Sequence, residues 1–345
     1  MSEWTSRSAV LRDGRFQIES VDVGEPEAGE VILEVAACGL CGTDHSLRHR
    51  SDLPRDTILG HEFAGTVVAL GRGVREWEVG DPAAVIPYPF CGRCELCSAG
   101  RPNLCRDALV EMVGAGRRPG GLTERLRLPA TQLRAIPPGQ DPTAYALVEP
   151  LAVALAAIDL GSITAGTRVG VLGLGPLGLF AALIARERGA LVFGMDARAT
   201  RVQCAHGLGL GAFVADDRAD ERIRDLTLGG PEVVIEASGR RDAIDRAGAI
   251  ARLGGRVVMV ASYHAPSEIQ PGHWLERGIS LLPSIAYTPE QFEEALAMVA
   301  GGGIDVGSLI TAVHSLDEVG EVFESFETQT DQIKLLIAPT HTSTR

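Results

Sequence analysis

The 345-residue sequence predicts an α/β protein with two domains, a small antiparallel β-barrel and a doubly wound parallel sheet. Its length exceeds that of one typical domain. The first 145 residues contain short β-rich segments that are separated by turns. From about residue 166, strand-like segments alternate with helical ones, and this alternation is typical of a parallel sheet.

Composition and charge restrict the partners and the location. The net charge of −13 argues against nucleic acid or an anionic membrane as the main partner. The longest apolar candidate, Ala146–Leu160, is interrupted by Glu149, Pro150 and Asp159, so no membrane span is expected. The N-terminus lacks a basic start followed by an apolar run, which predicts no secretory signal. We therefore expect a cytoplasmic protein with reduced cysteines.

The first domain is predicted from its strands and turns. Val31–Val35 and Phe63–Leu70 are rich in β-forming residues, and glycines at 71, 73 and 80 mark the turns. The loop 88–106 is expected to leave the barrel as an excursion. Pro137–Gly139 marks a break in the chain pattern.

Four cysteines in this excursion have the spacing C-x2-C-x2-C-x7-C, at positions Cys91, Cys94, Cys97 and Cys105. Four thiolates can close a tetrahedral shell around zinc, which is typical of a structural site rather than a catalytic one. Two disulfides would require an oxidising compartment. A ferredoxin-type cluster motif ends in C-x3-C-Pro, which differs from this spacing. The sequence therefore favours structural zinc.

The second domain is predicted from strand–helix alternation. The expected strands are Arg168–Leu172, Leu191–Met195, Glu232–Glu236 and Arg256–Ala261. A helix, Pro176–Arg188, is expected after the first of them. Beyond the parallel sheet, Thr288 can cap a helix that has Pro289 at its first position. An apolar strand, Ile333–Ile337, is expected near the end of the chain.

A glycine motif follows the first of these strands. Gly173-Leu174-Gly175-Pro176-Leu177-Gly178 is G-x-G-x-x-G, placed between a strand and a helix as dinucleotide binding requires. Asp196 follows at the end of the next strand, where a carboxylate can accept hydrogen bonds from the adenosine ribose and repel a 2′-phosphate. NAD is favoured over NADP, although Arg198 and Arg201 nearby keep NADP open. The alternative is a glycine-rich turn in a sheet that binds no nucleotide.

A second set of metal-binding residue types is dispersed along the chain. Three short distinctive segments each contain at least one such residue. They are Cys41-Gly42-Thr43-Asp44, Gly60-His61-Glu62 and Glu149-Pro150-Leu151, with Cys41, His61 and Glu149. A thiolate, an imidazole and one or two carboxylates would form a mixed zinc shell with a position left for water or substrate. Taken singly, each of these residues would be assigned to core packing or to the surface.

These motifs together resemble the zinc-containing medium-chain dehydrogenase/reductase family. His61, Glu62, Gly65, Gly71 and Val74 fit the family's zinc signature G-H-E-x2-G-x5-G-x2-[IV]. The four-cysteine segment, the Glu-Pro-Leu segment and the glycine motif follow in the family's order over essentially the whole chain. The Cys-His-Glu set is closest to the sorbitol, butanediol and threonine dehydrogenase branches.

The resemblance implies a GroES-like catalytic domain, residues 1–148 and 288–345, and a Rossmann NAD-binding domain, residues 149–287. It implies two zinc ions per chain. The residues implied for the catalytic zinc are Cys41, His61, Glu62 and Glu149, with Asp44 orienting His61. Those implied for the cofactor are Gly173, Gly175, Pro176, Leu177, Gly178, Asp196 and Arg201. A homodimer or homotetramer is expected.

The implied reaction is hydride transfer between a secondary alcohol and NAD, giving a ketone, with a polyol, diol, amino alcohol or cyclitol as substrate. Thr43 would hydrogen-bond the substrate oxygen and begin a proton relay. Many relatives carry a relay histidine where this chain has Ser46, and His45 is either its substitute or a surface histidine. Three alternatives are a zinc-stabilised nucleotide-binding protein without turnover, an NADP-dependent carbonyl reductase, and a zinc-independent enone or quinone reductase, which would lack both ligand sets.

Overall fold

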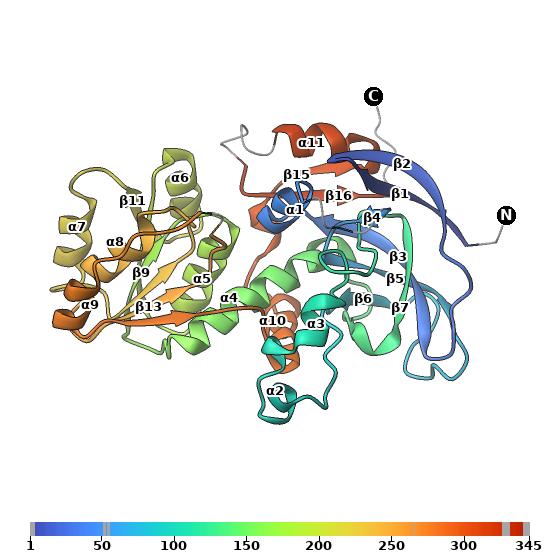
Figure 1. Ribbon diagram of the computed structural model, residues 1–345, viewed down its shortest axis with the longest axis horizontal. Helices are drawn as coiled ribbons and strands as arrows, with labels where there is room; N and C mark the ends of the chain where they lie inside the picture. Colours follow the sequence, from blue (N-terminus) through green and yellow to red (C-terminus); the bar gives the residue numbers. More distant parts are fainter. Residues whose placement is uncertain (1–3, 51–52, 54–55, 264, 326–331, 341–345) are drawn as a thin grey trace. The chain divides into compact units, whose positions relative to one another are not determined.

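The computed structural model describes residues 4–50, 53, 56–263, 265–325 and 332–340. The chain forms two compact units, Met1–Glu149 with Thr288–Arg345, and Pro150–Tyr287. Among the described residues the first unit has two sheets and the second has one, and each unit has its own apolar core. The strands of both units can be followed in Figure 1. The boundary therefore follows Glu149, the second residue of helix α4 (Val148–Leu160).

The first unit contains two sheets. One has three strands in the order β2-β1-β4, and the other has the order β15-β16-β3-β5-β6-β8, with β7 also paired to β3. These strands are β1 (Thr5–Arg12), β2 (Arg15–Asp22), β3 (Glu30–Gly39), β4 (Thr57–Ile58), β5 (Glu62–Leu70), β6 (Pro82–Val85), β7 (Arg125–Pro129), β8 (Leu133–Ala135), β15 (Ile310–Ser315) and β16 (Lys334–Ala338). Pairing is antiparallel throughout except between β15 and β16, which run parallel.

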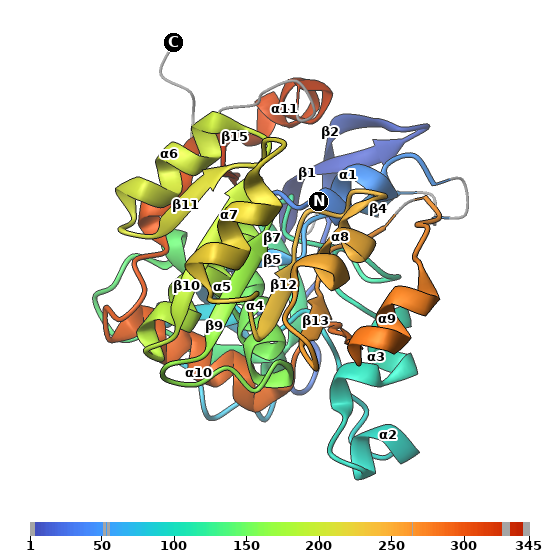
Figure 2. The same cartoon turned by 90° about the vertical axis from the view of Figure 1, so that its left-hand side faces the viewer.

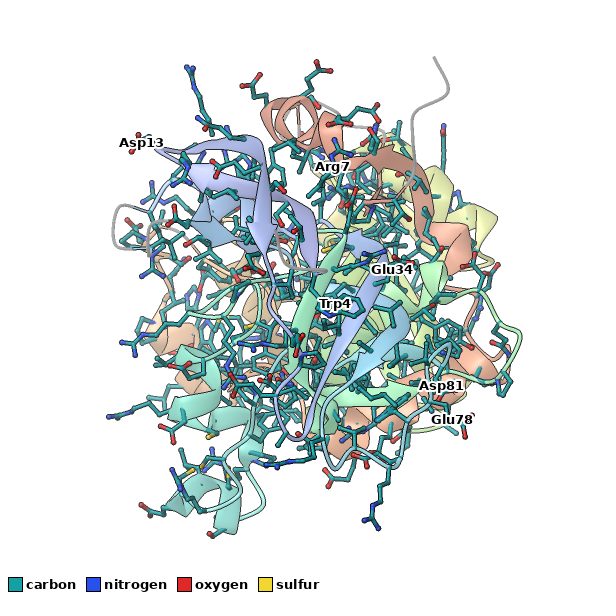
Figure 3. All side chains as sticks on the ribbon, turned by 90° about the vertical axis from the view of Figure 1, so that its right-hand side faces the viewer. Trp4, Arg7, Asp13, Glu34, Glu78 and Asp81 are labelled. Atoms are coloured by element: carbon teal, nitrogen blue, oxygen red, sulfur yellow. The ribbon has the colours of Figure 1, made fainter. Side chains whose placement is uncertain are left out.

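The β1–β2 hairpin joins its strands through Asp13 and Gly14, which have positive φ angles of 48° and 77°. Two consecutive left-handed residues are typical of a type I′ turn, and Asp-Gly is a favoured pair for it. Asp13 lies at the tip of this hairpin (Figure 3). The Asp-Gly pair is therefore a local sequence signal for this hairpin, which was not among the predicted elements.

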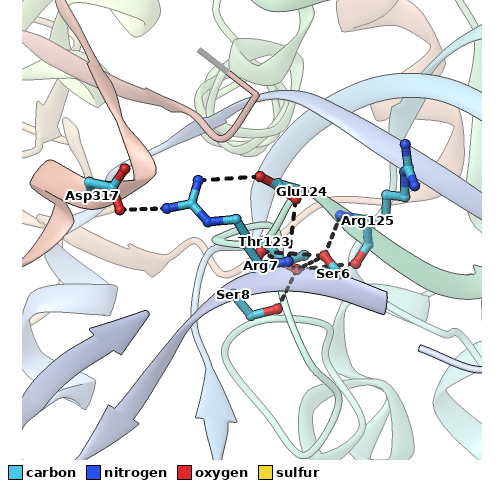
Figure 4. A network of polar contacts seen from close by, with 7 residues as sticks. All are labelled: Ser6, Arg7, Ser8, Thr123, Glu124, Arg125 and Asp317. Carbon is cyan, nitrogen blue, oxygen red and sulfur yellow. Dashed lines mark hydrogen bonds and ion pairs between the residues drawn. The ribbon is translucent and has the colours of Figure 1, made fainter. Parts of the chain in front are cut away.

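A buried hydroxyl network joins the two sheets of the first unit. The Thr123 hydroxyl lies 2.8 Å from Ser6 Oγ and 2.6 Å from Ser8 Oγ (Figure 4). Glu124 also donates its backbone N–H to the Arg7 carbonyl at 2.9 Å. These bonds close one side of an apolar core that includes Val31, Val35, Phe63, Val67, Leu126 and Phe323.

Short helices surround these sheets. They are α1 (Gly42–Leu47), α2 (Glu95–Ser98), α3 (Arg106–Val110), α10 (Pro289–Ala300) and α11 (Val319–Ser325). Thr288 caps α10 as predicted, since its hydroxyl accepts from the Gln291 N–H at 3.3 Å, and the Gln291 side chain accepts from the Thr288 N–H at 3.0 Å. This reciprocal pair is a capping box.

The second unit is a six-stranded, entirely parallel sheet in the order β11-β10-β9-β12-β13-β14. Its strands are β9 (Arg168–Leu172), β10 (Leu191–Asp196), β11 (Gly211–Val214), β12 (Val233–Glu236), β13 (Arg256–Met259) and β14 (Ser280–Pro283). The helices are α5 (Pro176–Glu187), α6 (Ala199–Gly207), α7 (Ala219–Leu226), α8 (Ala243–Ile250) and α9 (Pro271–Arg277), and Figure 2 shows α5, α7 and α8 around the sheet. The fold is the α/β class predicted above, with a Rossmann sheet.

One element differs from the sequence expectation. Within the described residues, one helical run, Pro142–Leu160, is long and apolar enough to cross a membrane, and 67% of its apolar window is buried inside the protein. Glu149 and Pro150 do not interrupt this run because they occupy the first turn of α4, where acidic residues and proline are tolerated. Its burial is that of a core helix.

Candidate active site

A tight loop after β3 presents Cys41 at the start of α1. The Cys41 sulfur accepts a hydrogen bond from the Thr43 backbone N–H at 3.5 Å, and the Asp44 carboxylate accepts one from the Cys41 N–H at 3.0 Å. Cys41 is thus the N-cap residue of α1. The thiolate is the form of a cysteine that binds metal.

Asp44 joins this helix to the loop before β5. It is completely buried, and its second carboxylate oxygen accepts from the Gly60 N–H and faces His61 Nδ1, each at 3.2 Å. Because Asp44 engages Nδ1, the other ring nitrogen of His61 is left to bind a metal. Burial alone would lower the pKa of His61, but the charges of Asp44 and Cys41 outweigh it and raise that pKa well above its usual value.

Glu62 is the first residue of β5 and is 1% exposed. Its carboxylate forms an ion pair with Lys334 of β16, which also donates to the Leu40 carbonyl at 2.9 Å. Burial lowers the pKa of Lys334, but the negative charges of Glu62, Cys41 and Asp44 raise it overall. Lys334 was not among the predicted site residues, although a lysine inside the apolar run Ile333–Ile337 was a visible signal for a buried partner.

Cys41, His61 and Glu62 come together from three places in the sequence. One ligand atom from each lies within 4.8 Å of the other two. Thiolate sulfur, imidazole nitrogen and carboxylate oxygen are the donors that zinc accepts in open sites, so this cluster fits a catalytic zinc.

Glu149 does not belong to that three-residue group. It is 4% exposed and lies in the first turn of α4. Burial raises the pKa of Tyr88, and the negative charges of Glu149 and Cys41 raise it further. Glu149 and Cys41 therefore both act on Tyr88 through their charges.

Thr43 and His45 follow Cys41 in α1, two and four residues after it. Thr43 is partly exposed, and its N–H is the donor to Cys41 described above. His45 is partly buried, and its ring meets that of His49 edge to face with centroids 5.5 Å apart. Ser46 points its hydroxyl to the Gly42 carbonyl at 2.9 Å, so it caps a backbone group.

The four-cysteine segment forms a second, separate cluster. Its ligand atoms all lie within 4.8 Å of one another, with Cys91 Sγ 3.9 Å from Cys97 Sγ, and all four cysteines are free of disulfides. The Arg93 and Cys94 N–H groups lower the pKa of Cys91 to about 6. A closed shell of four thiolates fits structural zinc.

The glycine motif lies in the second unit, between β9 and α5. Gly173 has a φ of 90° and donates its N–H to the Met195 carbonyl at 2.9 Å. A Cβ at Gly178 would collide with the Gly173 carbonyl, so only glycine permits this close helix–strand approach. Gly175 is the N-cap of α5 and Pro176 its first residue, which leaves helix N–H groups for a phosphate.

Asp196 ends β10 beside this loop. It accepts hydrogen bonds from the Leu174 and Arg198 N–H groups at 2.7 and 2.8 Å, and Arg201 Nη1 lies 3.5 Å away. Asp196, Arg198 and Arg201 line a cavity of about 280 Å³ together with Gly173, Met195, Ser238, Arg240 and Arg246. The cavity combines a glycine turn, one buried carboxylate and several arginines, which suits a nucleotide with anionic groups.

Two family descriptions match the chain. The Alcohol dehydrogenase GroES-like domain matches residues 27–138, and the Zinc-binding dehydrogenase description matches residues 176–301. Together they cover all residues of the two metal clusters and most of the parallel sheet. Glu149 lies outside both matched ranges.

Individual proteins are similar over nearly the whole length. A 2-dehydro-3-deoxy-L-galactonate 5-dehydrogenase from Pseudoalteromonas atlantica is 32% identical over 90% of this chain and 92% of its own. A sorbitol dehydrogenase from Halalkalibacterium halodurans is 30% identical over 94% and 96%. The crystal structure of a zinc-binding dehydrogenase from Sinorhizobium meliloti bound to NADP has a TM-score of 0.88 and 33% identity, covering 98% of this chain and 100% of that one.

Proposed function

The chain belongs to the zinc-containing medium-chain alcohol and polyol dehydrogenase family, and we propose that it oxidises a secondary alcohol to a ketone with NAD as hydride acceptor. The proposed substrates are polyols, diols, amino alcohols or cyclitols. The observation that carries the proposal is the cluster of half-buried Cys41 with buried His61 and Glu62, which offers three different zinc donors.

Cys41 and His61 would hold the zinc, with Glu149 or Glu62 as the third protein ligand. Zinc supplies a Lewis acid that lowers the pKa of an alcohol hydroxyl. Asp44 would fix the His61 ring through its Nδ1 and so present the opposite nitrogen to the metal. We propose that Glu149 and Glu62 exchange during turnover, because each is buried and acidic. Glu62 lies in the group of Cys41 and His61, and the charges of Glu149 and Cys41 both act on Tyr88.

Thr43 would accept the substrate proton and pass it outward. Its position two residues after Cys41, on the first turn of α1, supports a hydroxyl close to the proposed metal. His45 is the candidate for the next relay step, one residue farther along the helix than Asp44. Its partly buried ring beside His49 supports this role over that of a fully exposed surface histidine.

NAD is the proposed cofactor because of Asp196. Its buried carboxylate stands at the end of β10, where an acid accepts hydrogen bonds from the adenosine ribose and disfavours a 2′-phosphate. Arg198 and Arg201 line the same cavity, and the Sinorhizobium meliloti relative is bound to NADP, so NADP is the alternative. We also propose a cytoplasmic homodimer or homotetramer, which light scattering after size-exclusion chromatography would test.

A panel of alcohols read by nicotinamide absorbance tests the proposal. It should include polyols, diols, amino alcohols, cyclitols and sugar acids, each with NAD and with NADP. We expect oxidation of at least one secondary alcohol with NAD, and its loss in a Cys41→Ser variant. If the protein binds NADH, as followed by fluorescence, but oxidises no compound of the panel, the nucleotide-binding alternative without turnover gains support instead.

A further inference from the structure

A charged pair is completely enclosed next to the Cys41–His61 cluster. The side chains of Lys334 and Glu62 are each only 2% exposed, and the Lys334 ammonium contacts the Glu62 carboxylate. Lys334 begins β16 and Glu62 begins β5, and β3 lies between these strands in the sheet. Every residue of β16 is buried, so this ammonium stands in a strand that is otherwise apolar.

The surrounding backbone is shaped to admit this pair. A Cβ at Gly39 would collide with the Glu62 carboxylate and lie 3.0 Å from Lys334 Cε. The Lys334 ammonium also donates to the Leu40 carbonyl at 2.9 Å, immediately before Cys41. Since a buried charge is expensive unless it is paired and hydrogen-bonded, both contacts are needed to keep Lys334 in place.

Glu62 stands between two positive charges. One is the Lys334 ammonium, and the other is the metal that Cys41 and His61 would hold, since a Glu62 oxygen lies within 4.8 Å of their ligand atoms. Without Lys334, the metal would be the remaining cation able to balance the buried Glu62 carboxylate. Four protein ligands, Cys41, His61, Glu149 and Glu62, would then close the zinc shell as in a structural site.

We infer that Lys334 is a positioning residue that holds Glu62 away from the metal of Cys41 and His61, and thereby keeps one coordination position open for the substrate. This inference rests on the proposed function, because it requires a metal at Cys41 and His61. It assigns the resting ligand set to Cys41, His61 and Glu149. The strength of the ion pair between Glu62 and Lys334 then determines how readily Glu62 can displace substrate from the metal.

Cobalt substitution tests this without turnover. Co²⁺ is loaded in place of zinc, and the absorption spectrum of the Cys41→Ser variant is subtracted to isolate the Cys41 site. Imidazole, a small external metal ligand, is then titrated. In the unmodified protein the spectrum should shift as imidazole enters the open position. In Lys334→Met the shift should require about tenfold more imidazole or more, the size of effect seen for groups that tune metal ligands.

A second variant separates positioning from folding. In Lys334→Met with Glu62→Gln, the carboxylate is gone, so imidazole binding should return to that of the unmodified protein. Lys334→Arg, which keeps the charge, should resemble the unmodified protein. In Lys334→Met, the zinc at Cys41 and His61 should also dissociate more slowly in the presence of a chelator, because a fourth protein ligand holds it.

Results that would contradict the positioning role of Lys334 differ from the result that would contradict the proposed catalytic site. Faster zinc loss, or an imidazole titration in Lys334→Met like that of the unmodified protein, would overturn the positioning role and leave Lys334 a packing residue. A cobalt spectrum that is the same with and without Cys41 would instead overturn the proposed catalytic site itself, since no metal would then bind there.

Discussion

At the scale of single residues, Asp44 links the metal cluster to the fold. Its carboxylate accepts from the Cys41 and Gly60 N–H groups and faces His61 Nδ1, so one buried side chain orients two proposed ligands. Asp44→Asn keeps the shape but replaces one acceptor oxygen by an NH₂ donor. We expect zinc affinity at the Cys41 site to fall about 10- to 100-fold.

Competition with a chromogenic chelator measures this affinity. The control is Asp107→Asn, which changes an acidic residue in the first turn of α3 outside both metal clusters. Unchanged zinc affinity in Asp44→Asn would show that the Asp44 carboxylate is not needed to orient the His61 ring for zinc binding.

Asp196 is the residue that we expect to determine the choice between NAD and NADP. Removing its carboxylate in Asp196→Ala would remove a ribose acceptor and a repulsive charge at the 2′ position. A hydrogen bond to a charged group contributes about 1.5–3 kcal/mol, so the preference for NAD over NADP should fall by about tenfold or more. Asp242→Ala changes another carboxylate that lines the same cavity and is the matched control. An unchanged ratio of the two dissociation constants would refute the cofactor assignment.

The residues that the sequence could not place are those whose partners are distant. Cys41, His61 and Asp196 stand in recognisable local motifs, at the N-cap of α1, immediately before β5 and at the end of β10. Lys334 pairs with Glu62 from the far end of the chain, and no local pattern encodes which buried carboxylate a lysine will meet. The sequence signal was limited to a charged residue in an apolar strand.

At the scale of elements, local chemistry predicted the interior strands and the helix starts well. β9 has the expected bounds, and Thr288 caps α10 through the expected hydroxyl. The β13 strand ends at Met259 rather than Ala261, because Val260 and Ala261 both turn their N–H groups to the Glu236 carbonyl. The short edge strands β11 and β14 have mixed, partly exposed sequences and lacked a clear pattern.

The four-cysteine segment, residues 88–106, is predicted to depend on a bound zinc. Helix α2 within it and helix α3, which follows Cys105, have four and five residues, too short to be stable alone. Cys97→Ser should therefore lower the zinc content by one per chain and expose this segment to proteases. Alcohol oxidation by the surviving folded protein should persist, unlike in Cys41→Ser. If Cys97→Ser abolished turnover in protein that stayed intact and folded, the purely structural assignment would be wrong.

At the scale of the whole molecule, each unit supplies one half of the chemistry. The first holds both metal clusters, and the second holds the glycine turn and Asp196. The alternation of strands and helices predicted the Rossmann sheet, whereas the return of the chain after Tyr287 to the first unit depends on long-range pairing of β16 with β3. That pairing also brings Lys334 to the metal cluster.

The central claim is that this chain holds a catalytic zinc at Cys41 and His61 in addition to the zinc of the four-cysteine segment. Metal analysis of the purified protein and of Cys41→Ser, normalised to chain concentration, tests it most directly. We predict two zinc ions per chain in the unmodified protein, and one, with no alcohol oxidation, in Cys41→Ser. A single zinc per chain that is fully retained in Cys41→Ser would contradict the account.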